Sequence, residues 1–248
     1  MQKVFSNVYS KDWGKVIFWL IFPLVAFFGA QAIVAVIIRA VVFLSVGGNN
    51  ELVAQIMQNN TTTGFYIVVS FLATSMIAYF IPQKLLSKKF TPDDLGVQKD
   101  LTWSDVALGV LGLLITLLIA GVLLSLTNIH PGEQKIGFSG IHGPFQYILA
   151  FLSLAIIPAI VEEFIFRGIA YGELRKINPW LAMFIVSLTF GIAHLELSLG
   201  ITTFVMSFVA CFIREKITDT IWAGIILHFL KNALAFVVLF VLPTLTLM

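Results

Sequence analysis

The chain has 248 residues, of which 59% are hydrophobic and only 11% are charged, and its mean hydropathy is +0.98. A soluble globular protein carries about a quarter charged residues, so this chain lacks the charge needed to cover a water-facing surface. The net charge of +2 is too small to indicate a nucleic-acid partner. The single cysteine, Cys211, excludes an internal disulfide. The composition therefore indicates an integral membrane protein surrounded by lipid.

Long, continuous apolar runs predict membrane-spanning helices. We expect an all-α fold, a polytopic transmembrane helical bundle of about seven spans. The spans lie near Val16–Val46, Gly64–Ile81, Val106–Leu126, Phe145–Tyr171, Pro179–Leu195, Gly200–Ile213 and Ile217–Leu242. The sixth is shorter than the roughly 20 residues that a full span needs, so the sequence also allows six or eight spans.

Basic residues gather in alternate loops. They are Lys3, Lys11 and Lys15 before the first span, Lys84, Lys88, Lys89 and Lys99 after the second, Arg175 and Lys176 after the fourth, and Arg214 and Lys216 after the sixth. The other loops contain Lys135 only. Because basic residues favour the cytoplasmic side, we predict a multi-pass cell-membrane protein with a cytoplasmic N-terminus.

A polar stretch over residues 88–105 separates the first two spans from the others. It divides the chain into an N-terminal part, residues 1–105, with two spans and this connector, and a helical core, residues 106–248. We interpret the stretch as a connector within one helical domain.

The fourth span carries ionisable side chains inside an apolar run. Its sequence AIVEEFIFRG contains Glu162, Glu163 and Arg167, and an ionisable group in a membrane is costly unless it is paired or faces a polar cavity. Glu163 and Arg167 are four residues apart and share a helix face, whereas Glu162 projects about 100° away from Glu163. We therefore expect one glutamate to neutralise the arginine while the other points elsewhere.

Two later spans carry polar residues at the same spacing. Phe190 and His194 (FGIAH) share a face of the fifth span, and His228 and Asn232 (HFLKN) share a face of the seventh. At about 1.5 Å per residue, Glu162, His194 and His228 lie roughly 12, 21 and 16 Å from the cytoplasmic ends of their spans. Because these depths overlap, we expect the three helices to surround one polar cavity.

A carboxylate near imidazole groups is what activation of water requires. A glutamate can take the proton, and imidazole or amide groups can hold the oxyanion of a tetrahedral intermediate. The alternative is a buried polar network that only fixes helix packing. Packing alone does not require Glu162 beside the already paired Glu163, so the sequence favours a catalytic site.

The order of these motifs on successive helices is specific. Glu-Glu-x-x-x-Arg, then Phe-x-x-x-His, then His-x-x-x-Asn resembles the CAAX-processing and bacteriocin-processing family of intramembrane proteases, also called CPBP or Abi. This family includes the Ras-converting CAAX endopeptidase of eukaryotes. The resemblance covers about residues 145–236 and includes the longer stretches EEFIFRGIAYGELRK and IWAGIILHFLKNALA.

The resemblance implies a role for each motif residue. Glu162 and His194 would activate the attacking water. His228 and Asn232 would stabilise the oxyanion.

Glu163 and Arg167 would support those four residues. The resemblance leaves a metal cofactor undecided. Glu162, His194 and His228 could together bind a divalent ion such as zinc, although the chain has no HExxH motif.

The chain departs from the family pattern at several places. The stretches FVACFIRE and KITDTIWA stand where members often have glycines and a Thr-Gly-Ser turn, which affects local packing more than chemistry. Lys231 lies between the two expected oxyanion residues. It could extend toward the membrane surface, pair with a carboxylate such as Glu196, or perturb the site.

Other functions fit the sequence less well. Ser139 in GFSG imitates the serine motif of rhomboid proteases but falls in a polar, glycine-rich loop. A non-catalytic membrane partner, such as a bacteriocin-immunity factor, would not need both glutamates and both histidines. A transporter would also use intramembrane charges, and it predicts flux through the membrane that depends on Glu162.

The sequence therefore predicts an intramembrane endopeptidase. Its substrates should be peptides or lipidated proteins that reach the middle of the bilayer. Lipidated C-termini, leader peptides and single-pass helices all meet this condition.

Overall fold

The computed structural model describes residues 9, 11–130, 137–138 and 140–242, and this part of the chain is helical apart from short turns. The helices are α2 (Asp12–Ser45), α3 (Asn50–Met57), α4 (Asn60–Leu86), α5 (Pro92–Leu95), α6 (Trp103–Thr127), α7 (Gly143–Phe151), α8 (Ile157–Glu162), α9 (Gly172–Leu174), α10 (Pro179–Ala193), α11 (Leu197–Ile213) and α12 (Trp222–Phe236). Four π-helical segments extend or join them, at Leu152–Ile156, Glu163–Tyr171, Arg214–Thr218 and Val237–Val241.

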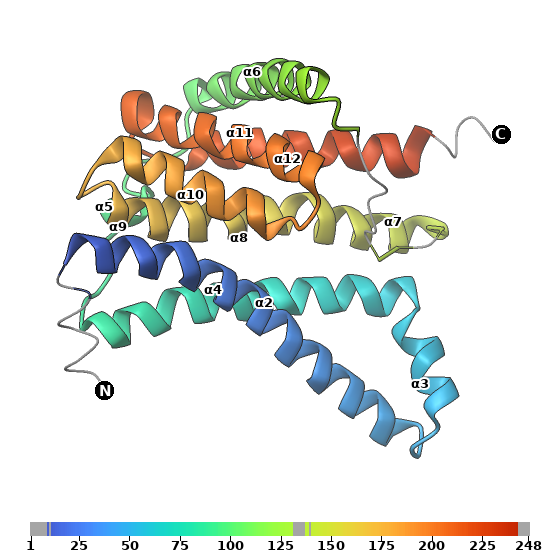
Figure 1. The fold of residues 1–248 in the computed structure, drawn as a ribbon. Coiled ribbons are helices and arrows are strands. Elements are labelled where there is room, and N and C mark those ends of the chain that lie inside the picture. The colour runs from blue at the N-terminus through green and yellow to red at the C-terminus, as the bar shows by residue number, and fades with distance from the viewer. Residues whose placement is uncertain (1–8, 10, 131–136, 139, 243–248) are drawn as a thin grey trace.

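Within the described residues, six helical stretches are long and apolar enough to cross a membrane, and the shorter α10 is a seventh apolar helix. This confirms the predicted polytopic all-α bundle of about seven spans. The fourth span is one stretch, Gly143–Leu174, in which two π-helical segments alternate with α7, α8 and α9. Figure 1 shows the long helices side by side, with α6 on one face of the bundle and α2 and α4 on the other.

The short helix is the fifth, not the sixth as the sequence suggested. The sixth span has 22 residues, Leu197–Thr218, because the polar residues after Ile213 continue it as the π-helical segment. The chain then turns at Asp219, which has φ 60°. The last span therefore begins at Trp222 instead of Ile217.

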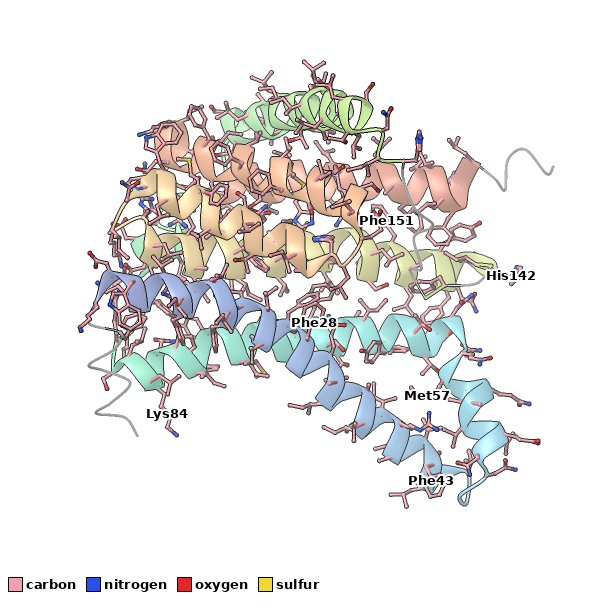
Figure 2. The ribbon with its side chains drawn as sticks, in the orientation of Figure 1. Phe28, Phe43, Met57, Lys84, His142 and Phe151 are labelled. Carbon is pink, nitrogen blue, oxygen red and sulfur yellow. The ribbon has the colours of Figure 1, made fainter. Side chains whose placement is uncertain are left out.

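The two ends of the bundle carry different segments of the chain. One end carries α5 and Lys84, and the opposite end carries α3, Met57 and His142 (Figure 2). The second half of α2 diverges from the other helices toward the α3 end (Figure 1), and α2 contains Pro23. A proline inside a helix removes a backbone hydrogen bond and favours such a bend.

Large side chains along the outer helices are exposed, for example Leu118 at 69% and Val36 at 67%, as expected for a lipid-facing surface.

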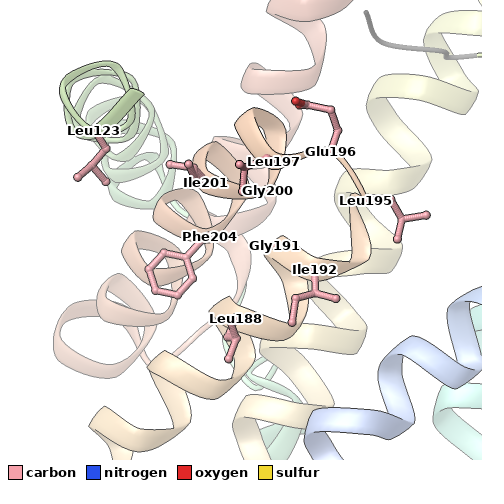
Figure 3. A pocket seen from close by; sticks show the side chains of 10 residues that line it. All are labelled: Leu123, Leu188, Gly191, Ile192, Leu195, Glu196, Leu197, Gly200, Ile201 and Phe204. Atoms are coloured by element: carbon pink, nitrogen blue, oxygen red, sulfur yellow. The ribbon is translucent and has the colours of Figure 1, made fainter. Parts of the chain in front are cut away.

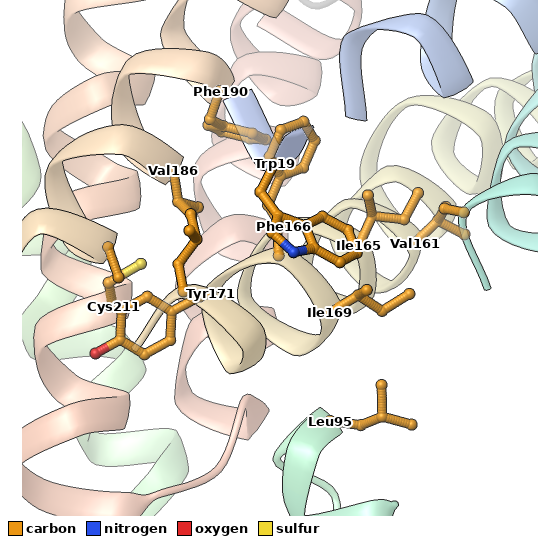
Figure 4. Close-up of a cluster of buried hydrophobic side chains, with 14 of the residues drawn as sticks. Trp19, Leu95, Val161, Ile165, Phe166, Ile169, Tyr171, Val186, Phe190 and Cys211 are labelled. Atoms are coloured by element: carbon orange, nitrogen blue, oxygen red, sulfur yellow. The ribbon is translucent and has the colours of Figure 1, made fainter. Parts of the chain in front are cut away.

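The apolar core lies where α2, the fourth span and α10 meet. Trp19, Phe166 and Phe190 are almost completely buried there (Figure 4). The rings of Phe166 and Phe190 pack edge to face with their centroids 4.8 Å apart, a favoured geometry for aromatic pairs. This cluster fixes α10 against the helix that carries the two glutamates.

The polar connector packs closely against the fourth span. Lys176 donates to Asp94 at 2.5 Å and to Glu173 at 2.6 Å. Burial alone would raise the pKa of Asp94, but its hydrogen bonds from Lys176 and Thr91 lower it well below its ordinary value. The connector is thus bound to the helix end by charged hydrogen bonds, which are stronger than neutral ones.

Two further side chains close this junction. Arg214 is buried and donates to the carbonyl oxygens of Arg167, of Gly168 at 3.3 Å and of Asp94 at 2.9 Å. Gly172 lies against the backbone of the connector, so that a Cβ at this position would fall on the carbonyl oxygen of Asp94. The sequence suggested that Arg214 belongs to a loop, but its guanidinium instead joins the connector to the fourth span.

Gly172→Ala should therefore destabilise the protein. The added methyl group meets rigid backbone, and overpacking of this kind costs about 1–3 kcal/mol. The measurement is thermal unfolding of purified protein in detergent. Gly121→Ala is the matched control, because nothing lies within 4 Å of its Cβ position and alanine is the better helix former. An unfolding midpoint for Gly172→Ala equal to that of Gly121→Ala would contradict the close approach.

Candidate active site

A buried ion pair occupies the centre of the fourth span. Nη2 of Arg167 lies 3.0 Å from Oε1 of Glu163, and the two side chains are 1% and 0% exposed. The Arg167 guanidinium also lies over the ring of Phe190, 4.3 Å from its centroid, where a cation–π contact is favourable. Gly224 leaves room for the carboxylate, since a Cβ there would lie 2.6 Å from Oε2 of Glu163. Glu163 is thereby enclosed and neutralised.

His228 joins the two glutamates. Its Nδ1 lies 3.1 Å from Oε1 of Glu163, and its Nε2 lies 3.8 Å from Oε2 of Glu162. A glutamate that is ionised, as the pairing with Arg167 favours, can only accept hydrogen bonds. We therefore assign a hydrogen to Nδ1 of His228, and this leaves Nε2 directed toward Glu162.

His194 is oriented by its own helix. Its Nδ1 lies 2.8 Å from the carbonyl oxygen of Phe190, which can only accept, so Nδ1 carries the hydrogen and the neutral ring has its lone pair on Nε2. The rings of Phe190 and His194 lie edge to face with centroids 4.9 Å apart. One phenylalanine thus contacts both Arg167 and His194, which accounts for the Phe-x-x-x-His spacing.

A cavity of about 270 Å³ brings the motifs together. It is lined by Glu162, His194, His228 and Asn232, with Lys231 beside them. The rest of its wall is mainly apolar and comes from α4, the fourth span, α11 and the last span. Glu163 and Arg167 do not line it. The two adjacent glutamates therefore face different surroundings, one a cavity and the other a cation.

A larger cavity of about 510 Å³ lies between α6, α10 and α11 (Figure 3). Its wall is formed by apolar side chains and by two glycines, Gly191 and Gly200, with Glu196 at one end. The carboxylate of Glu196 caps α11 by accepting from the backbone of Ser198 and Leu199. None of the six motif residues lines this cavity, so it offers no comparable chemistry.

Glu162, His194 and His228 are the candidate metal ligands that the sequence offered. Among the described residues, no group of three or more His, Cys, Asp or Glu side chains is placed to hold a metal ion. Glu162, His194 and His228 share the cavity but do not converge on one point in this way.

The structure brings together residues that the sequence predicted and adds one that it did not. All six motif residues lie in one connected cluster of side chains. The guanidinium of Arg214 donates to the backbone carbonyl oxygen of Arg167 and so contacts this cluster. No residue spacing in the sequence predicts this contact. Ser139, the residue of the rhomboid alternative, lies outside the described residues.

Fold and site together define a polytopic helical membrane protein with a cavity whose polar residues come from three of its spans. Residues 144–234 match the family model of the type II CAAX prenyl endopeptidase Rce1-like proteins. A Bacillus subtilis (strain 168) protein named "Putative membrane peptidase YdiL" is 28% identical over 173 residues, which cover 68% of this chain and 69% of the relative. No solved structure matches the chain significantly. These two matches support the resemblance to the CAAX-processing family over the stretch that carries the three motifs.

Arg167→Ala should be far more destabilising than Glu162→Gln. Removing Arg167 leaves the Glu163 carboxylate buried without its cation, which costs about 3–5 kcal/mol. Glu162 faces a cavity and is the partner of no arginine or lysine within ion-pair distance among the described residues, so its amide replacement should change the stability little. Thermal unfolding in detergent compares the two variants. Equal losses would show that Arg167 and Glu163 do not depend on each other for burial.

Proposed function

We propose that this protein is a glutamate-dependent intramembrane endopeptidase. The observation that carries the proposal is the division between the two glutamates. Arg167 neutralises Glu163 at 3.0 Å, whereas Glu162 faces the cavity beside two histidines. A second buried carboxylate is costly for folding. A role in the activation of water would explain why Glu162 is nevertheless present.

In this proposal Glu162 and His194 activate one water molecule. Either Glu162 or Nε2 of His194 accepts the proton of the water while its oxygen adds to the carbonyl carbon of the scissile peptide bond. The same proton then passes to the leaving nitrogen as the carbon–nitrogen bond breaks. Two new chain ends are released, a carboxylate and an amine.

The negative charge that develops on the carbonyl oxygen is held by His228 and Asn232. Preorganised donors in a site without bulk water stabilise such an oxyanion strongly. For His228 to donate from Nε2, both ring nitrogens must carry hydrogen. Nδ1 then donates to the Glu163 carboxylate at 3.1 Å, and Nε2 donates on the side of the cavity. Glu163 and Arg167 act in support, since they orient the ring of His228.

The cavity also suggests the substrate class. Its wall includes the apolar side chains of Phe71, Leu154 and Phe236 besides the polar residues, so it fits a peptide with hydrophobic or lipidated parts more than a soluble one. Lipidated C-termini, leader peptides and single-pass helices remain the candidate substrates. The family name supports a CAAX-type peptidase.

We further propose that the α5 end of the bundle faces the cytoplasm. The basic residues Lys84, Lys99 and Arg175 belong to segments at this end (Figures 1 and 2), and basic residues favour the cytoplasmic side. The N-terminal helix α2 starts at the same end (Figure 1).

Glu162→Gln should abolish proteolysis without unfolding the protein. The amide keeps the shape of the side chain but cannot take a proton, and loss of a catalytic base typically lowers the rate about 10²–10⁴-fold. We would compare peptide ends by mass spectrometry in host cells that express either the wild type or Glu162→Gln at matched levels. New ends that occur only with the wild type are expected, and they would also identify the substrate class.

Glu173→Gln serves as the matched control, because Glu173 belongs to the same span but binds Lys88 and Lys176 outside the cavity. Identical peptide ends for wild type and Glu162→Gln, with both proteins folded, would refute glutamate-dependent proteolysis. That result would favour the non-catalytic membrane partner.

A further inference from the structure

Lys231 is a charged residue of the cavity wall that the proposed reaction does not use. Its side chain is half-buried, and it lines the cavity together with Glu162, His194 and Asn232. Among the described residues no carboxylate lies within ion-pair distance of its ammonium group. The ammonium instead donates to Oδ1 of Asn232 at 3.3 Å. A lysine within a membrane span is rare, and it usually marks a functional site.

This hydrogen bond decides which way the Asn232 amide points. The two ends of an asparagine amide are nearly alike in shape, so that its orientation depends on its partners. An ammonium group can only donate, and Lys231 therefore draws the oxygen of the amide toward itself. The Nδ2 amino group is left without a hydrogen-bond acceptor among the described residues, at the wall of the cavity.

We propose that Lys231 is a positioning residue for anion binding in this cavity, which turns the Asn232 amide so that its Nδ2 group donates to the bound anion. The proposal rests on the proposed function, because the anion in the reaction is the oxyanion of the tetrahedral intermediate. Without Lys231 the amide could present its oxygen, which would repel that charge. The positive charge of the ammonium group adds to the attraction, since charges act strongly in a water-poor site.

A purely structural role fits the observations less well. A lysine that only filled space or extended to the membrane surface would not need to bond a neighbouring side chain inside the cavity. Glu162 lines the same cavity, but its carboxylate is not among the ion-pair partners of Lys231 in the described part of the chain. Glu196, the carboxylate that the sequence offered for such a pair, caps the first turn of α11, and no ion pair between Glu196 and Lys231 is found among the described residues.

The test uses octylphosphonic acid, whose charged head resembles a tetrahedral oxyanion and whose alkyl chain suits the apolar wall. Its dissociation constant would be measured by calorimetry with the full chain in lipid nanodiscs. The proteins compared are wild type, Lys231→Met, Asn232→Ala and the double variant. Lys231→Arg keeps the donor, and Lys216→Met removes an exposed lysine that lies over the ring of Trp180. Lys231→Met is expected to fold, because it removes a charge from the membrane interior.

We expect Lys231→Met to weaken binding about tenfold, the loss typical of one hydrogen bond to a charged group. In the Asn232→Ala background the same change should weaken it only about twofold, because the amide that Lys231 orients is gone. Lys231→Arg and Lys216→Met should bind like wild type. Unchanged binding by Lys231→Met would overturn the proposal. An equal loss in both backgrounds would also overturn it, since Lys231 would then act on the anion without Asn232.

This measurement is independent of peptide cleavage. If the comparison of peptide ends shows no Glu162-dependent product while the coupling between Lys231 and Asn232 is found, the proposed protease fails but the anion site stands. If cleavage depends on Glu162 and the coupling is absent, the protease stands and the role given to Lys231 fails.

Discussion

The arrangement of the site depends on the buried ion pair between Glu163 and Arg167. Both side chains are enclosed within the bundle, and neither charge would be tolerated there without the other. Glu163 orients His228, and Phe190, which covers Arg167, also contacts His194. One pair therefore sets the positions of side chains from three spans, while Glu162 is left to face the cavity.

The surrounding helix is adapted to hold this pair. The segment Glu163–Tyr171 is π-helical, a conformation that is rare and frequently found at functional sites. Two of its carbonyl groups accept from the Arg214 guanidinium, which also reaches the connector. Backbone groups inside a membrane must find partners within the protein, and Arg214 supplies them. The polar connector is thus joined directly to the helix that carries the glutamates.

Lys231 fits the chemistry that we propose for the cavity. It stands between His228 and Asn232 in the sequence, and its ammonium group bonds the amide of Asn232. In our proposal this contact prepares the amide for an anion. The cavity would then hold a base on one side and donors on the other, as hydrolysis of a peptide bond requires.

The sequence by itself determined the class of fold and indicated which residues form the candidate site. Long apolar runs can satisfy their backbone in lipid only as helices or closed barrels, and the spacing of four residues placed Glu163 beside Arg167. The tertiary structure decided which residues far apart in the chain contact one another, which the spacing of residues along one helix cannot show. The sequence placed Arg214 in a loop and therefore made the sixth span too short. The carbonyl groups that accept from the Arg214 guanidinium lie more than 40 residues away in the chain, so that no local pattern could reveal them. The partners of His228 likewise depended on how the separate helices pack, since contacts between spans are fixed by tertiary packing and not by periodicity.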